Sequence, residues 1–560
     1  MVSFDEEKQN KKLTLLREQE EENLAKILSE KYGLQYMDLS VVSISSEALR
    51  LVRVEEAKEA EIAPFSLIGK NAKIGVRSPN NPKTKTAVAR IEKLGYSVSL
   101  FMVSTKSLER VWTRYADLSH ATQTKEGVLE VSDEEIQKEL AGIKTLEDVA
   151  SKIGETTSLK RVYKISRIVE NILAGALALR ASDIHIEPEE KNVRLRFRLD
   201  GVLTDVAHLD TETHNLLVSR IKLLSGLKLN VKEEAQDGRF SIKMGKNEIE
   251  IRSSILPGSY GEAIVMRVLN PDSINVSLEQ LGMSEKLLEI VGKEIQKPNG
   301  MILNTGPTGS GKTTTLYAIL RKVHKPEIKI LTIEDPVEYH LEGIVQTQVE
   351  TKKGYTFSSG LRAALRQDPD VIMVGEIRDG ETADIAINAS LTGHLVLSTL
   401  HTNSASGTFP RLTNLGANPK NLASAVNLAM AQRLVRKLCP HCKKEDVPNQ
   451  EELHIIKKIV DSMENLSFRP TETGKIWRPG SCEKCGNLGY KGRVGIFEAI
   501  LVNRALEQVI NNYPSEREIK EATKDQGLPD LRQDAVIKIL NGTTSFEEVT
   551  RVIDLEEGLE

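Results

Sequence analysis

One octapeptide constrains the fold of this 560-residue chain more than any other feature: residues 306–313 read GPTGSGKT. They fit the pattern G-x-x-x-x-G-K-[ST], after the apolar run 301–303 and before apolar residues at helical spacing. Glycines let backbone N–H groups turn towards phosphate, and the N-terminus of a following helix adds partial positive charge. The pattern therefore predicts a phosphate-binding loop between a strand and a helix.

The loop residues indicate how a nucleoside triphosphate would be held. Lys312 has the position from which a lysine reaches the β- and γ-phosphates, and the Thr313 hydroxyl has that of a Mg²⁺ ligand. The expected nucleotide-binding residues are Gly306, Pro307, Thr308, Gly309, Ser310, Gly311, Lys312, Thr313 and Thr314.

Two acidic groups follow apolar runs downstream of this loop. Glu376 comes directly after the run 371–374, and Glu338 lies in an acidic stretch after 328–333. Ligands of open α/β sheets gather at the carboxyl ends of strands, and hydrolysis needs carboxylates for the metal and the attacking water. We therefore expect both acids at the site, although either stretch alone would also fit loop solvation or helix capping.

A third apolar run, 395–399, is bounded by His394 and His401. A histidine at a strand end is usually structural, and a sensor of the γ-phosphate is the alternative. From residue 278 onwards, such strand-like runs alternate with helical stretches, which is typical of an α/β domain with a mostly parallel sheet.

An alternating segment lies upstream of this domain. Apolar residues at 193, 195, 197 and 199 alternate with three arginines and an aspartate, which predicts a strand with one buried face. Arg194, Arg196 and Arg198 share the other face. This face is either solvated or a cationic surface for phosphate.

The four cysteines form two C-x-x-C pairs, Cys439 with Cys442 and Cys482 with Cys485. Four thiolates at this spacing would close a tetrahedral Zn²⁺ site, which would be structural because no position stays open. Free thiols or a redox pair are the alternatives.

Composition narrows the class of protein. Hydrophobic residues at 39% and charged residues at 28% allow packed cores. The net charge of −4 gives no electrostatic reason to expect nucleic acid as a partner. We find no secretory signal and no run of about 18 apolar residues that would span a bilayer.

With these motifs in order, the chain resembles the ATPases of type II secretion and type IV pilus systems, specifically their assembly branch. Residues 306–313 resemble the Walker A motif of that family. Residues 332–340 look like its Asp box, 365–379 like its Walker B segment and 391–403 like its His box; 181–188, 196–201, 236–240 and 261–267 look like its second N-terminal domain.

The resemblance implies a hexameric ring whose subunits hydrolyse ATP. It places Glu376 beside the metal and water, with Glu338 as the better candidate for polarising the attacking water, and makes His394 and His401 sensors. Arg196, Arg198 and Arg220 become candidate contacts to the γ-phosphate.

The implied fold is an α/β, multidomain one, with a RecA-like P-loop core preceded by two α+β domains. We expect a helical extension at 1–33, a platform-docking domain at 34–118, a linker with one or two short helices at 119–155, a PAS-like nucleotide-contacting domain at 156–272, the ATPase core at 278–435, the tetracysteine zinc region at 436–498 and C-terminal helices at 499–560.

The implied activity is that of a cytoplasmic motor that polymerises pilins, with the pseudopilus motor of type II secretion as the alternative. The tetracysteine insertion favours these over the retraction branch. An inner-membrane platform protein and a cytoplasmic adaptor are the implied partners. No Arg-Leu-Gly motif precedes Leu34, so we expect no cyclic dinucleotide. A non-hydrolysing scaffold would lack Glu338 and Glu376, and a nucleic-acid translocase would need base-stacking aromatics, whereas aromatics are 4% here.

Overall fold

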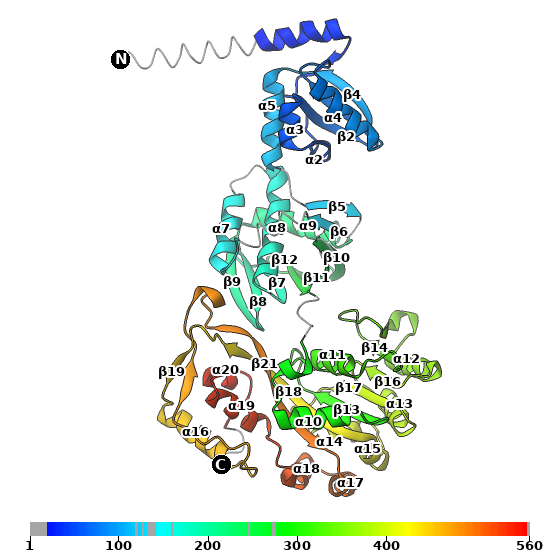
Figure 1. Cartoon of the computed structure of the whole chain (residues 1–560), viewed down its shortest axis with the longest axis vertical. Coiled ribbons are helices and arrows are strands. Elements are labelled where there is room, and N and C mark those ends of the chain that lie inside the picture. Colours follow the sequence, from blue (N-terminus) through cyan, green and yellow to red (C-terminus); the bar gives the residue numbers. More distant parts are fainter. Residues whose placement is uncertain are drawn as a thin grey trace. The chain divides into compact units, whose positions relative to one another are not determined.

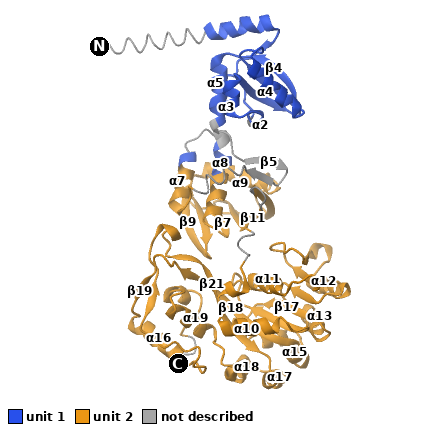
Figure 2. Cartoon of the chain, in the orientation of Figure 1, with its two compact units in different colours: residues 1–122, 155–168 blue, residues 123–154, 169–560 orange. Residues whose placement is uncertain are grey.

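Figure 1 shows the computed structural model, which describes residues 20–117, 121–125, 128–131, 142–157, 161–244, 247–270 and 276–556. The chain divides into two compact units (Figure 2). One contains residues 1–122 and 155–168, and the other contains 123–154 and 169–560. Among the described residues, no helix combines the length and the apolar character that crossing a membrane requires.

The first unit is built on a four-stranded sheet with the order β1-β4-β3-β2. Its strands are β1 (Gln35–Tyr36), β2 (Ile62–Ile68), β3 (Asn71–Val76) and β4 (Ser97–Met102), and its helices include α2 (Ser46–Leu49), α3 (Val54–Glu59), α4 (Pro82–Lys93) and α5 (Thr105–Thr113). Ile74 is buried in one apolar cluster, and Phe65 packs edge-on against Phe101 in another.

An eight-stranded sheet with the order β5-β6-β10-β11-β12-β7-β8-β9 follows. Its strands are β5 (Ala121–Lys125), β6 (Val128–Val131), β7 (Asp183–Pro188), β8 (Val193–Leu199), β9 (Val202–Leu209), β10 (Gln236–Met244), β11 (Asn247–Gly258) and β12 (Gly261–Leu269), and its helices are α7 (Leu146–Thr157), α8 (Arg161–Ala178) and α9 (Thr211–Leu224). Strand β8 alternates buried and half-buried residues, as predicted.

The segment 119–155, predicted as a linker with one or two short helices, also has strands among its described residues, and 119–120, 126–127 and 132–141 lie outside the described residues. It contributes β5 and β6 at one edge of this sheet in addition to the helix α7, and β6 pairs in parallel with β10. An edge strand is ordered by backbone hydrogen bonds on one side and needs few apolar side chains. Because the segment contains few apolar residues, its sequence did not indicate β5 and β6.

The C-terminal domain has a seven-stranded sheet with the order β15-β14-β16-β17-β13-β18-β21. Six strands are parallel, and β21 pairs antiparallel with β18. The strands are β13 (Gly300–Thr305), β14 (Ile330–Glu334), β15 (Val345–Gln348), β16 (Val371–Val374), β17 (Leu395–Leu400), β18 (Val426–Leu438) and β21 (Tyr490–Leu501). The helices are α10 (Glu285–Glu294), α11 (Lys312–Val323), α12 (Phe357–Ala364), α13 (Gly380–Leu391), α14 (Thr408–Asn414) and α15 (Pro419–Ala425).

Both faces of this sheet are buried. Met301 and Leu303 belong to the cluster that contains α12 and α13, while Ile302 belongs to the one that contains α10 and α11. Because the faces of a parallel sheet are covered by helices, its central strands are apolar throughout. This explains why the sequence shows these strands as short uninterrupted apolar runs.

The remaining elements surround the cysteines and the end of the chain. They are β19 (Lys444–Asp446), β20 (Ile476–Arg478), α16 (Gln450–Asp461), α17 (Arg504–Ile510), α18 (Glu516–Thr523), α19 (Leu531–Leu540) and α20 (Phe546–Thr550). Arg478 binds Asp446 and Glu452, and it also pairs with Glu547, so one guanidinium joins β20 to three other segments.

Candidate active site

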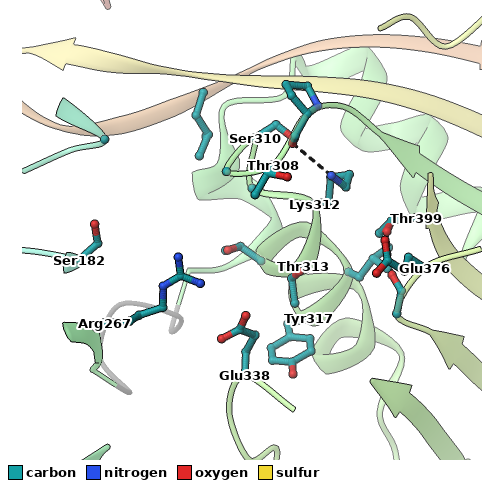
Figure 3. A pocket seen from close by; sticks show the side chains of 18 of the residues that line it. Ser182, Arg267, Thr308, Ser310, Lys312, Thr313, Tyr317, Glu338, Glu376 and Thr399 are labelled. Carbon is teal, nitrogen blue, oxygen red and sulfur yellow. Dashed lines mark hydrogen bonds between the residues drawn. The ribbon is translucent and has the colours of Figure 1, made fainter. Parts of the chain in front are cut away.

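A cavity of about 850 Å³ lies where β13, β14, β16 and β17 end at their carboxyl termini. The phosphate loop forms its centre, and Asp183, Arg198 and Arg267 of the eight-stranded sheet form part of its wall. Figure 3 shows loop residues such as Thr308 and Lys312 between Arg267 on one side and Glu376 on the other. This volume falls in the range of small-molecule sites.

The glycines of the phosphate loop are required by its geometry. Gly306, Gly309 and Gly311 all have positive φ, at 147°, 80° and 89°. A Cβ on Gly306 would lie 2.5 Å from the carbonyl oxygen of Gln432, and a Cβ on Gly311 would lie 2.9 Å from the side-chain Nε2 of Gln432. Only glycine lets the loop pack so closely and turn in this way.

Lys312 begins α11 and lies in the cavity. Its Nζ donates to the carbonyl oxygens of Gly306 at 2.8 Å and Pro307 at 3.1 Å. Burial lowers the pKa of Lys312, while the charge of Glu376 raises it and that of Arg433 lowers it further. Of the nine predicted nucleotide-binding residues, all but Gly306 line the cavity.

Both predicted acids line the same cavity. The largely buried Glu376 pairs with Arg378, and its Oε2 lies 3.1 Å from the Nε2 of His401. Glu338 lies 3.5 Å from the guanidinium of Arg252, which also donates to the carbonyl oxygen of Val337 at 2.7 Å. The two acids are therefore held differently: Glu376 by Arg378 and His401, and Glu338 by an arginine from β11.

A third acid, Glu334, is buried at the end of β14. Tyr317 donates its hydroxyl to one carboxylate oxygen, and Thr332 and Gln346 donate to the other at 2.5 and 3.0 Å. All three donors are neutral groups. The burial of Tyr317 and the nearby Glu334 both raise the pKa of the tyrosine.

The two histidines lie at opposite ends of β17. His401 follows the strand and lines the cavity. His394 precedes it, and its Nδ1 lies 3.0 Å from the carbonyl oxygen of Ala389. The structure thus brings only His401 together with the acids.

The predicted arginines are also separated. Arg198 lines the cavity and lies 3.3 Å from Asp183, whereas Arg196 pairs with Glu187 on the neighbouring strand. Arg220 on α9 is not among the residues that line the cavity, and burial lowers its pKa, opposed by Glu170.

Further cationic residues line the cavity that the sequence did not single out. They are Arg267, Arg378, Arg433, Arg493 and Arg551. Arg267 donates to Asp183 at 3.1 Å, so this aspartate receives both Arg198 and Arg267. The only signal in the sequence was the position of Arg267 at the end of the segment 261–267, which resembles the second N-terminal domain of the family.

A buried polar network joins the two ends of the phosphate loop to β18. The side-chain oxygen of the buried Gln432 accepts from Asn304 and from Thr315, each at 2.8 Å. These two donors lie just before and just after the loop. A glutamine and an arginine directly after the apolar run 428–431 of β18 were the signal for this network.

The four cysteines converge as their spacing predicted. Their sulfur atoms all lie within 4.8 Å of one another, with distances of 3.8 Å for Cys439 to Cys482 and for Cys442 to Cys485. Four thiolates about 2.3 Å from one zinc ion have sulfur atoms roughly 3.8 Å apart. The donor set and its spacing fit zinc.

Residues 159–551 match the family model described as Type II/IV secretion system protein, and residues 32–122 match the MshEN domain. The chain belongs to the Type II/IV secretion system protein family. Members of this family are the ATPases of secretion and pilus systems, so the chain is an ATP-hydrolysing enzyme.

Two relatives within the family match different lengths of the chain. The Type II secretion system protein E of Aeromonas hydrophila is 46% identical over 389 residues, which are 69% of this chain and 75% of the relative. The Type IV pilus assembly ATPase PilB of Pseudomonas aeruginosa is 38% identical over 543 residues, 94% of this chain and 90% of the relative. The X-ray structure of the Yersinia pseudotuberculosis ATPase DotB shares the fold, with a TM-score of 0.50 and 21% identity over 69% of this chain and 92% of that chain.

Proposed function

We propose that this member of the Type II/IV secretion system protein family is a motor that hydrolyses ATP to drive pilin polymerisation. The observation that carries the proposal is the extent of the PilB match, which spans 94% of this chain and so includes its N-terminal part. The pseudopilus motor of type II secretion is the second candidate, because the Type II secretion system protein E of Aeromonas hydrophila is 46% identical over the 389 residues that it matches.

We assign phosphate binding to the loop and to Lys312. The amine now rests on two loop carbonyls, and the phosphates of ATP would offer it stronger, charged acceptors. The Thr313 hydroxyl and Glu376 would hold Mg²⁺, which neutralises charge on the phosphates. Glu376 and Glu338 are the candidates for orienting and deprotonating water.

The cationic residues of the cavity wall have a distinct proposed role. Arg198 and Arg267 approach the loop from the eight-stranded sheet, where both are held by Asp183. A guanidinium that reaches the γ-phosphate would stabilise charge in the transition state and link hydrolysis to movement of that sheet. The roles predicted for Arg196, Arg220 and His394 stay predictions, because these residues are not among those that line the cavity. His401 is the proposed sensor beside Glu376.

The assembly and its surroundings complete the proposal. We propose a cytoplasmic homohexamer that works with an inner-membrane platform protein and an adaptor, and that binds neither nucleic acid nor a cyclic dinucleotide. The MshEN match at 32–122 marks the segment for which we propose docking on the platform. The four cysteines would hold a structural Zn²⁺ beside the ATPase core.

Electron microscopy of surface filaments, with secreted proteins assayed in parallel, separates the two candidate functions. Cells in which Glu376→Gln replaces the wild-type chain are expected to be bald and to secrete normally. Cells carrying Glu381→Gln, an exposed residue on α13 paired with Arg362, serve as the control and should keep their pili. Normal pili with exoproteins trapped inside the Glu376→Gln cells would instead assign the chain to type II secretion.

A further inference from the structure

Arg433 lies in the wall between two cavities of the C-terminal domain. It is on β18 and is 8% exposed. One side faces the nucleotide cavity, and the other faces a second cavity of about 650 Å³ formed by the loop after β17, β21, α18 and the start of α19. The buried Arg433 side chain therefore lines both cavities.

The contacts of Arg433 join two segments of the active site. Its guanidinium donates to the carbonyl oxygen of Asn403 at 2.9 Å, two residues after His401, and to that of Gln432 at 3.0 Å. A Cβ on Gly306 would lie 3.2 Å from its Nη1, so the same group packs against the first glycine of the phosphate loop. Arg433 therefore spans the distance between this glycine and the loop that follows the proposed sensor.

A second link fixes the same two segments. The backbone N–H of Thr402 donates to Oγ1 of Thr305 at 2.8 Å, at the carboxyl end of β13. The loop 402–406 is held on its other side by Glu516 of α18, which accepts from Ser404 and Ser406. This loop thus has anchors on both sides, and Arg433 supplies the charged one next to the phosphates.

The charge of Arg433 acts on both cavities. Burial lowers its pKa, and the carboxylate of Glu498 on β21 opposes that effect. Towards the nucleotide cavity, the same cation lowers the pKa of Lys312. The guanidinium is therefore a second positive charge near the phosphate loop, and on its far side burial raises the pKa of Glu498 to about 7.

We propose that Arg433 is a positioning residue for ATP hydrolysis, which holds the loop carrying His401 in register with the phosphate loop. The inference rests on the proposed roles of that loop and of His401. It separates two contributions of the guanidinium. Its planar fork bridges two carbonyl oxygens, and its charge favours bound phosphates. A lysine keeps the charge but has no fork, and a glutamine has neither.

Steady-state kinetics of the full chain test this separation. For Arg433→Lys, we expect kcat to fall about tenfold with KM for ATP within about threefold of wild type. For Arg433→Gln, we expect the same fall in kcat together with a rise in KM of about tenfold or more, because the buried charge is lost. Thermal melting of each variant gives the folded fraction to which kcat is normalised.

Arg436→Gln provides the matched control for loss of an arginine from β18. Arg436 binds Glu548 and is absent from the residues lining either cavity in the described structure. This variant should melt at a lower temperature but keep the wild-type kcat and KM. The inference would be overturned if both Arg433 variants kept the wild-type kcat and KM. It would also be overturned if their activity fell only in proportion to the folded fraction, as is expected for Arg436→Gln. Absence of hydrolysis by the wild-type chain would instead refute the proposed function itself.

Discussion

Glu376→Gln is expected to lower kcat for ATP hydrolysis by at least about 100-fold while ATP binding persists. Glutamine has nearly the same shape as glutamate, so the end of β16 keeps its geometry. The amide cannot accept a proton and carries no charge for Mg²⁺, and proton transfer by a positioned side chain contributes roughly 10²–10⁴-fold. Phosphate release and the binding of a fluorescent ATP analogue measure the two effects separately.

Glu381→Gln is the control for this substitution. Glu381 lies five residues further along the chain, is exposed and pairs with Arg362. Its loss should leave kcat unchanged. If Glu376→Gln hydrolyses ATP within about threefold of the wild-type rate, activation of water passes to Glu338 and the role proposed for Glu376 fails.

Cys482→Ser is expected to release zinc and to lower the apparent Tm by roughly 5–10 °C. Binding of zinc by four thiolates contributes directly to folding free energy, and each kcal/mol lost shifts Tm by about 2–4 °C in domains of this size. A serine hydroxyl in place of one thiolate leaves three cysteine ligands. Metal analysis of the purified chain and calorimetry measure the two outcomes.

Ser481→Ala provides the neighbouring control. The Ser481 hydroxyl donates to Asn487 at an exposed position next to the cluster. This variant should keep one zinc per chain and the wild-type Tm. Unchanged zinc content and Tm in Cys482→Ser would show that the four cysteines are not a zinc site.

Features that depend on a few consecutive residues were predictable from the sequence. The phosphate loop needs glycines at fixed positions between a strand and a helix, and the structure has positive φ at Gly306, Gly309 and Gly311. The acids were found because the carboxyl ends of parallel strands meet at one edge of a sheet. Glu338 and Glu376 accordingly line one cavity.

Features that depend on distant segments were not predictable in the same way. Arg267 and Arg493 reach the cavity from strands of different sheets, and no local pattern in a single sequence reports which segments will face each other. His394 and His401 look equivalent as the two ends of one strand. A six-residue strand separates its ends by roughly 20 Å, so one site receives only one of them.

The charged face of β8 shows a related limit. Alternation predicted the buried side of the strand, but each of its arginines has a different acidic partner on a neighbouring segment. Only Arg198, whose partner Asp183 also lines the cavity, is directed to the phosphate loop. Pairing with acids on neighbouring segments therefore decides which arginine reaches the cavity. The periodicity of the sequence carries no information about that pairing.

Steady-state phosphate release from Mg-ATP by the purified chain, by Lys312→Ala and by Lys322→Ala shows whether this cavity hydrolyses ATP. Both lysines are on α11, but Lys312 lies in the cavity, whereas Lys322 is exposed and pairs with Glu279. We expect turnover by the wild-type chain and by Lys322→Ala, and a loss of turnover by about 100-fold or more in Lys312→Ala. Equal turnover in all three proteins would show that this cavity is not where ATP is hydrolysed.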